Sequence, residues 1–101
     1  MVRLLVLYEQ PRDEAEFDRH YREVHIPLAK ALPGLRRYTV GRGPRPVRGG
    51  RPCYLVGELD WDDMAALEHA FTSPEGRATA ADMVNLSAGG VRSMVYAVED
   101  V

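Results

Sequence analysis

Two histidines and a tyrosine lie close together between residues 17 and 35 of the chain, in the sequence FDRHYREVHIPLAKALPGL. Imidazole has an ordinary pKa near 6.5, so it serves as a general acid or base close to neutral pH. Tyr21 precedes His25 by four residues, which makes their side chains neighbours on a helix. We therefore take His25 as the candidate catalytic acid or base, with His20 and Tyr21 as its candidate catalytic partners.

A structural role competes with chemistry at these positions. Hydrophobic and aromatic residues recur at helical intervals and predict one buried stripe: Phe17, Tyr21, Val24 and Leu28. On a regular helix His20 and His25 lie on the two margins of this stripe, roughly 140° apart. At such margins a histidine either borders a cleft between helix and sheet or simply satisfies its hydrogen bonds within the structure.

Other kinds of chemistry fit the sequence less well. Histidines five residues apart diverge on a helix, whereas two ligands of one ion prefer spacings of three or four. No serine lies in a G-x-S-x-G turn, and Cys53 has no basic neighbour that would favour a thiolate. The glycines of residues 42–52 lack the GxGxxG spacing of a dinucleotide site. We expect neither a metal nor a cofactor.

Tyrosines on the predicted strands are the candidate substrate-binding residues. They are Tyr8, Tyr38, Tyr54 and Tyr96. Each one either lines the cleft beside the histidines or belongs to a core or dimer interface. The ligand expected in such a cleft is a small apolar or aromatic metabolite.

Composition limits the classes of partner. The chain has 101 residues, enough for one domain spanning 1–101, and a formal net charge of -2. A net charge this close to zero gives the chain no general attraction to nucleic acid or to an anionic membrane. No apolar run has the ~18 residues of a membrane helix, and the first residues do not resemble a signal peptide. With one cysteine and no intrachain disulfide, we expect a soluble, cytoplasmic protein.

Hydrophobic periodicity and turn residues predict alternating strands and helices. We expect strands at 2–8, 35–41, 53–61 and 91–98, and helices at about 13–31, 62–71 and 74–87. Pro27 should kink or break the first helix near His25, because proline has no N–H and disfavours helix at the preceding residue. Residues 42–52 form a basic loop rich in glycine and proline.

The order strand, helix, strand, strand, helix, strand is that of a ferredoxin-like α+β fold, βαββαβ. In this fold a four-stranded antiparallel sheet carries both helical regions on one face. The strands nevertheless place hydrophobic residues on both faces, as in Leu5 and Leu7 against Leu4 and Val6. We therefore expect the uncovered face to pack against that of a second copy, giving a homodimer.

The segment YEQPRDEAEFDRHYREVHIPLAKALPGLRRYTVGR resembles the EthD family of the dimeric α+β barrel superfamily. The pattern includes the element F-x-x-H-Y-x-x-x-H-x-P-L, and the later SPEGRATAADMVNL, with Asp82, is similar to the family's second helical region. The resemblance covers nearly the whole chain and implies the fold and the dimer expected above. Members are associated with degradative gene clusters, and related barrels include cyclases, isomerases, decarboxylases and cofactor-independent monooxygenases.

Three functions compete. The first is a cofactor-independent enzyme, a lyase or isomerase, that uses His25 for acid-base chemistry on a small apolar carbonyl or phenolic compound. The second is a non-catalytic protein that binds such a metabolite in the same cleft, as an accessory to a degradative or biosynthetic pathway. The third, weaker alternative is a cofactor-free monooxygenase. The identity of the substrate is not encoded in any motif of the chain.

Overall fold

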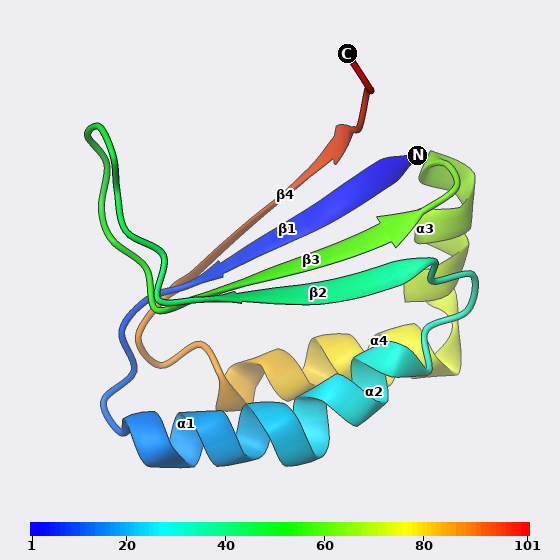
Figure 1. The fold of residues 1–101 in the computed structure, drawn as a ribbon. Helices are drawn as coiled ribbons and strands as arrows, with labels where there is room; N and C mark the ends of the chain where they lie inside the picture. Colours follow the sequence, from blue (N-terminus) through cyan, green and yellow to red (C-terminus); the bar gives the residue numbers. More distant parts are fainter.

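Four antiparallel strands form a single sheet in the computed structural model, which describes all 101 residues. The strands are β1 (Val2–Tyr8), β2 (Arg37–Arg42), β3 (Leu55–Trp61) and β4 (Val91–Ala97), in the spatial order β2-β3-β1-β4. Figure 1 shows the sheet with the helices beneath it. The order of elements and the antiparallel pairing confirm the predicted ferredoxin-like α+β fold.

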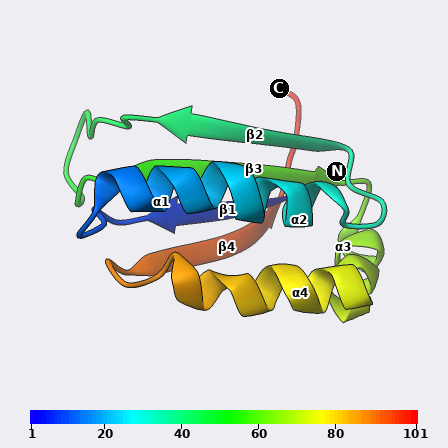
Figure 2. The same ribbon diagram turned by 90° about the horizontal axis from the view of Figure 1, so that it is seen from below.

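The helices lie on one face of the sheet. The first helical segment comprises α1 (Glu14–His20), a π-helical turn η1 (Tyr21–His25) and α2 (Ile26–Lys30). The second comprises α3 (Met64–Thr72), α4 (Pro74–Asp82) and the short 3₁₀ turn η2 (Met83–Asn85). Figure 2 shows the first segment and α4 running side by side across the sheet. No helix is both long enough and apolar enough to cross a bilayer.

Side-chain caps fix where three of the helices begin. Asp13 accepts a hydrogen bond from the backbone N–H of Glu16 at 3.1 Å, and Asp63 accepts one from that of Ala66 at 2.8 Å. Ser73 caps α4, with Pro74 in the first helical position. These caps satisfy N–H groups that have no partner within the first turn of a helix.

Pro27 does not break the first helix, but the irregularity expected near His25 is present as the π-turn over Tyr21–His25. The backbone N–H of Ile26 donates to the carbonyl of Tyr21, five residues earlier, so the chain forms a π-turn just before the proline. In a regular helix the missing N–H of Pro27 would leave an unpaired carbonyl one turn earlier and a ring clash. Widening the turn by one residue relieves this conflict, and the helix continues to Lys30.

Three other predicted boundaries shift by a few residues. β2 begins at Arg37 rather than at residue 35, and β3 begins at Leu55, so Cys53 and Tyr54 precede the strand. The helix predicted over 74–87 ends at Asp82 and continues as the 3₁₀ turn. Figure 1 shows the long loop between β2 and β3 projecting beyond the end of the sheet.

The hydrophobic core lies between the helices and the sheet, in two neighbouring clusters. One contains Val2, Ala29, Leu32, Leu59, Trp61, Leu67 and Ala70. The other contains Val6, Tyr8, Phe17, Tyr21, Leu55 and Leu86. Trp61 is completely buried and donates its indole N–H to the carbonyl of Pro33 at 3.0 Å, which ties the end of the first helical segment to β3.

The opposite face of the sheet has no element packed on it, as Figure 1 shows. Strand alternation and the pairing register place on it the side chains of Leu5, Leu7, Val56, Met94 and Tyr96. Met94 is 47% exposed and Tyr96 is 39% exposed. A bidentate ion pair between Arg3 and Asp60, at 2.7 and 3.0 Å, borders this hydrophobic patch.

Gly76 controls how closely α4 approaches α3. A Cβ atom at this position would lie 2.1 Å from the carbonyl oxygen of Ala70 and 2.5 Å from the Cα of Phe71, both of them backbone atoms. We predict that Gly76→Ala lowers the free energy of unfolding by about 1–3 kcal/mol, because the helices must move apart. Gly41→Ala is the matched control, since its Cβ would make ordinary contacts, at 3.6 Å from Val56. Urea unfolding of both variants tests this, and equal stabilities would contradict it.

Candidate functional site

The π-turn brings the two histidines onto one carboxylate. His20 Nε2 lies 2.8 Å from Asp82 Oδ1, and His25 Nδ1 lies 2.9 Å from Asp82 Oδ2. The expected divergence of roughly 140° is therefore wrong. An i→i+5 turn adds one residue, so residues five apart take the relation that residues four apart have in an α-helix.

His25 also lies at the centre of the buried stripe rather than on its margin. The buried residues of this segment, spaced four apart, are Phe17, Tyr21, His25 and Ala29. Val24 and Leu28, which regular helical periodicity places in the stripe, are only half-buried. The π-turn again explains the difference, because it rotates the residues that follow it relative to α1.

Asp82 is the residue that sequence reasoning did not assign to the site. It ends α4, is buried, and accepts a further hydrogen bond from the side-chain amide of Asn85 at 3.0 Å. Burial acts to raise the pKa of Asp82, but the hydrogen bonds from Asn85, His20 and His25 outweigh it and hold the pKa below its usual range. The sequence signal for Asp82 was that its segment, SPEGRATAADMVNL, is similar to the EthD family's second helical region. This segment lies far from either histidine in sequence.

These hydrogen bonds define the tautomer of His25. An ionised carboxylate only accepts, so Nδ1 of His25 carries the hydrogen and, in the neutral ring, Nε2 carries the lone pair. Nε2 has no hydrogen-bond partner, and no fully buried side-chain nitrogen lacks one, so Nε2 must reach open space. Burial lowers the pKa of His25, against the opposing effect of Asp82, and the ring is a neutral base at pH 7.

The open space beside His25 is a pocket of about 140 Å³, here called the inner pocket, between the helices and the sheet. Its apolar walls include Leu4, Val6, Ala29, Leu59, Phe71 and Met83. Its polar side chains are Tyr8, Tyr21, His25, Tyr38, Thr79 and Ser93. An apolar cavity of about this volume holds a benzene ring, so the inner pocket suits a ligand of one small ring.

Two tyrosines with bonded hydroxyls, Tyr21 and Tyr38, line the same pocket as His25. The hydroxyls of Tyr21 and Tyr38 are 2.5 Å apart, and burial raises the pKa of both, so they stay protonated at neutral pH. One hydroxyl donates to the other, which leaves one O–H free to donate to a ligand. Gly57 makes room for the pair, since a Cβ there would lie 3.3 Å from the Tyr21 hydroxyl.

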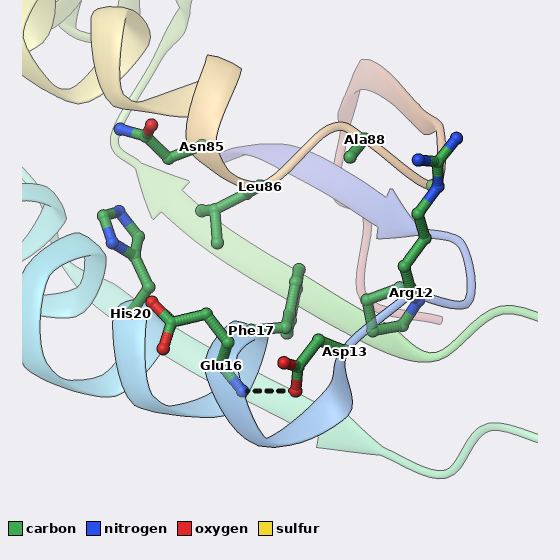
Figure 3. Close-up of a pocket in the computed structure, with 10 residues that line it drawn as sticks. Arg12, Asp13, Glu16, Phe17, His20, Asn85, Leu86 and Ala88 are labelled. Carbon is green, nitrogen blue, oxygen red and sulfur yellow. Dashed lines mark hydrogen bonds between the residues drawn. The ribbon is translucent and has the colours of Figure 1, made fainter.

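His20 borders a different space. The outer pocket, of about 270 Å³, lies between the start of α1 and the segment after α4. Figure 3 shows Asp13, the cap of α1, with Glu16 and His20 on the helix and Asn85, Leu86 and Ala88 opposite. His20 is not among the residues that line the inner pocket. Of the three candidate catalytic residues, the inner pocket therefore brings together His25 and Tyr21 only.

Two of the four candidate substrate-binding tyrosines line the inner pocket and two do not. Tyr8 and Tyr38 line the inner pocket, and Tyr8 donates to the sulfur of Met83 at 3.5 Å. Tyr54 packs edge-on against Phe17 and donates to Asp18, away from the pocket. Tyr96 lies on the uncovered face, since it pairs with Arg3. Of the two roles left open for each candidate, Tyr54 and Tyr96 thus do not have the one at the inner pocket.

The lowered pKa of His25 makes stability depend on pH. Between the unfolded value of 6.5 and the lower folded value, the unfolded chain binds more protons at this residue, so stability falls as the pH drops through this window. We predict that the free energy of unfolding decreases from about pH 7.5 to about pH 5. In His25→Asn, which keeps an N–H near Nδ1, the decrease should be smaller. Urea unfolding across this range tests it, with the exposed His69→Asn as control, and equal slopes in all three proteins would contradict it.

Comparison with known proteins supports these assignments of fold. Residues 9–90 match the EthD domain. An uncharacterized 11.0 kDa protein of the thcB-thcC intergenic region of Rhodococcus erythropolis is 34% identical over 100 residues, covering 99% of this chain and 96% of that protein. The crystal structure of an EthD family protein from Bacillus halodurans is 36% identical, with a TM-score of 0.88, over 98% of this chain and 99% of that one.

More distant structures share the fold. A hydroxynitrile lyase from Passiflora edulis is 16% identical, with a TM-score of 0.75, over 99% of this chain and 94% of that one. A cofactor-independent oxygenase from Streptomyces nogalater is 19% identical, with a TM-score of 0.66, over 99% and 94%. A dimeric ferredoxin-like protein of unknown function from Thermobifida fusca is 17% identical, with a TM-score of 0.70, over 96% and 90%.

The sequence comparison and the structure comparison indicate the same family. The matched residues 9–90 include the first helical segment, its π-turn and Asp82. Relatives above 30% identity align along almost the whole length of the chain. The protein belongs to the EthD domain family.

Proposed function

We propose that the protein is a cofactor-independent enzyme that removes a proton from a small, neutral carbonyl or phenolic compound. His25 is the general base, and the hydroxyl pair of Tyr21 and Tyr38 holds the oxygen of the substrate. The observation that carries the proposal is the free Nε2 of His25 at an apolar pocket that also offers an unused tyrosine O–H. A neutral imidazole with a bonded Nδ1–H is the form that accepts protons.

The lining of the inner pocket supports a neutral substrate. It contains no Asp, Glu, Lys or Arg, and ten of its fourteen lining residues are apolar or aromatic, the three tyrosines included. A carboxylate or phosphate group would enter such a pocket without a cation to replace its hydration, which costs several kcal/mol. A ketone or phenol loses much less, because one donor and one acceptor satisfy it.

The reaction follows from the placement of these groups. The C–H proton next to the carbonyl moves to His25 Nε2, and the C–H electron pair forms an enolate whose oxygen accepts a hydrogen bond from the tyrosine pair. The carboxylate of Asp82 stabilises the imidazolium that results. Return of the proton to another carbon completes an isomerisation, and departure of a neighbouring group completes a lyase reaction.

The names of two distantly related structures indicate alternative reactions for this fold. A hydroxynitrile lyase and a cofactor-independent oxygenase both share this fold. Fold similarity alone does not select a reaction, so the choice of proton abstraction rests on the geometry of His25 and the tyrosine pair. A non-catalytic protein would use the same pocket to bind its metabolite, and the experiment below separates the two functions.

Deuterium exchange at the α-carbon of cyclohexanone tests the proposal. This probe has one six-membered ring and a carbonyl, and exchange in D₂O requires only the abstraction and return of a proton. We predict exchange above the buffer rate, reduced on the order of 100-fold or more in His25→Asn, consistent with the loss of a general base. His69→Asn is the matched control, because His69 is exposed on α3.

Binding of phenol and cyclohexanone, followed by NMR, completes this test. Saturable binding without exchange in the wild-type protein would indicate the accessory function. Exchange that is unchanged in His25→Asn would remove His25 from the mechanism. Consumption of oxygen with a dihydroxy-aromatic compound would instead indicate a monooxygenase.

We also propose that the protein is a homodimer in which the uncovered sheet faces pack together. The support is the hydrophobic patch defined by Leu5, Leu7, Val56, Met94 and Tyr96, together with the dimeric ferredoxin-like structure that shares the fold. Sheets with apolar side chains on both faces are normally covered on both. A cytoplasmic location is proposed with it, in keeping with the free Cys53.

Two methionine variants test the dimer. Met94→Glu places a charge on the patch, whereas Met64→Glu places one at the start of α3, and the two side chains are similarly exposed, at 47% and 42%. We predict by light scattering a dimer for the wild type and Met64→Glu, and a shift toward monomer for Met94→Glu, because a charge buried without a partner is costly. A wild-type monomer at micromolar concentration would contradict the proposal.

A further inference from the structure

Because His20 and His25 share the carboxylate of Asp82, the protonation state of one ring affects that of the other. We infer that Asp82 is a positioning residue that couples His20 to His25, so that a proton taken up by His20 at the outer pocket makes His25 a weaker base in the inner pocket. The coupling itself is independent of the reaction, while its effect on turnover rests on the proposed function.

Each oxygen of the Asp82 carboxylate accepts a hydrogen bond from a different histidine. Oδ2 accepts from His25 Nδ1, and Oδ1 accepts from His20 Nε2 and from Asn85 Nδ2. Since an ionised carboxylate has no proton to give, each histidine donates one N–H and leaves its other nitrogen free. For His25 the free nitrogen is Nε2 at the inner pocket, and for His20 it is Nδ1, on a ring that borders the outer pocket.

The two rings therefore take up protons on different sides of the same residue. His25 is buried, with a side chain 6% exposed, whereas that of His20 is 17% exposed. The side chain of Asp82 is 7% exposed, so solvent screens its charge poorly. One buried negative charge cannot stabilise two imidazolium ions as well as it stabilises one, which is the basis of coupled titration.

Other charged and titratable groups surround the two histidines and Asp82. On the outer side are Arg12, Asp13 and Glu16, and on the inner side are Tyr8, Tyr21 and Tyr38. The three tyrosines have raised pKa values through burial and remain neutral over the range in which histidine titrates. Glu16 has a lowered pKa, chiefly through its hydrogen bond with Arg19, so it stays ionised over the same range. Neither these tyrosines nor Glu16 therefore changes charge over that range.

This arrangement separates substrate binding from the response to pH. An uncharged ligand of the inner pocket contacts His25, while His20 bonds to Asp82 and lines the outer pocket instead. His20, a candidate catalytic residue on sequence grounds, is thus assigned a positioning role. Its protonation lowers the basicity of His25 without any group entering the substrate pocket.

Histidine titration by ¹H–¹⁵N NMR tests the coupling directly in three variants. His20→Gln keeps an N–H donor near the position of Nε2 but does not titrate, and we predict that it raises the pKa of His25 by roughly half a unit, about three-fold in proton affinity. Asp82→Asn removes the charge and should lower the pKa of His25. His69→Gln, on exposed α3, should leave it unchanged. The ¹⁵N shifts should also show Nδ1–H on neutral His25.

Two results would overturn the inference: an unchanged pKa of His25 in His20→Gln, or a neutral His25 protonated on Nε2. Because His20→Gln retains the hydrogen bond, the test does not depend on whether Asp82→Asn folds. The acid limb of the cyclohexanone exchange profile should move to higher pH in His20→Gln, in step with the titration. If no variant or wild-type protein exchanges deuterium while the titration shift is observed, the proposed function fails and the coupling stands.

Discussion

The hydrogen bonds from His20 and His25 to the Asp82 carboxylate connect the two helical segments, and the site depends on them. Without them α4 would present a buried charge with no cationic or N–H partner from α1 and η1, which is among the costliest defects a protein interior can hold. With them, the imidazole of His25 is oriented, its tautomer is determined, and its ring lines the inner pocket. The same bonds hold α4 beside the first helical segment, and that contact forms one wall of the pocket.

A single backbone irregularity makes these bonds possible. Regular helical geometry would separate His20 from His25 by roughly 140°, and no one carboxylate would reach both. The π-turn removes this separation and also accommodates Pro27, whose ring and missing N–H disfavour a regular helix. One local change therefore resolves a backbone conflict and brings two histidines onto one carboxylate.

Much of the fold was predictable from the sequence because its signals are local. The apolar run at residues 2–8 predicted β1, the start of α4 at residue 74 was predicted correctly, and the order of elements gave the ferredoxin-like topology. The site was only partly predictable. His25, Tyr21, Tyr8 and Tyr38 were identified by residue type, but Asp82 lies 57 residues from His25, and no periodic pattern links positions so far apart. The position of His25 was misjudged because periodicity assumes a constant number of residues per turn, which η1 does not have.

The long sequence separation within the site has a consequence for folding. His20 and His25 meet Asp82 across 62 and 57 residues of chain, so the pocket exists only after both helical segments have docked on the same sheet. Contacts of this kind form late, since they require closure of long loops. An opening motion that releases α4 would open the inner pocket while leaving the sheet paired. Any ligand of the inner pocket would oppose that motion, and so stabilise the packing of α4 against the first helical segment.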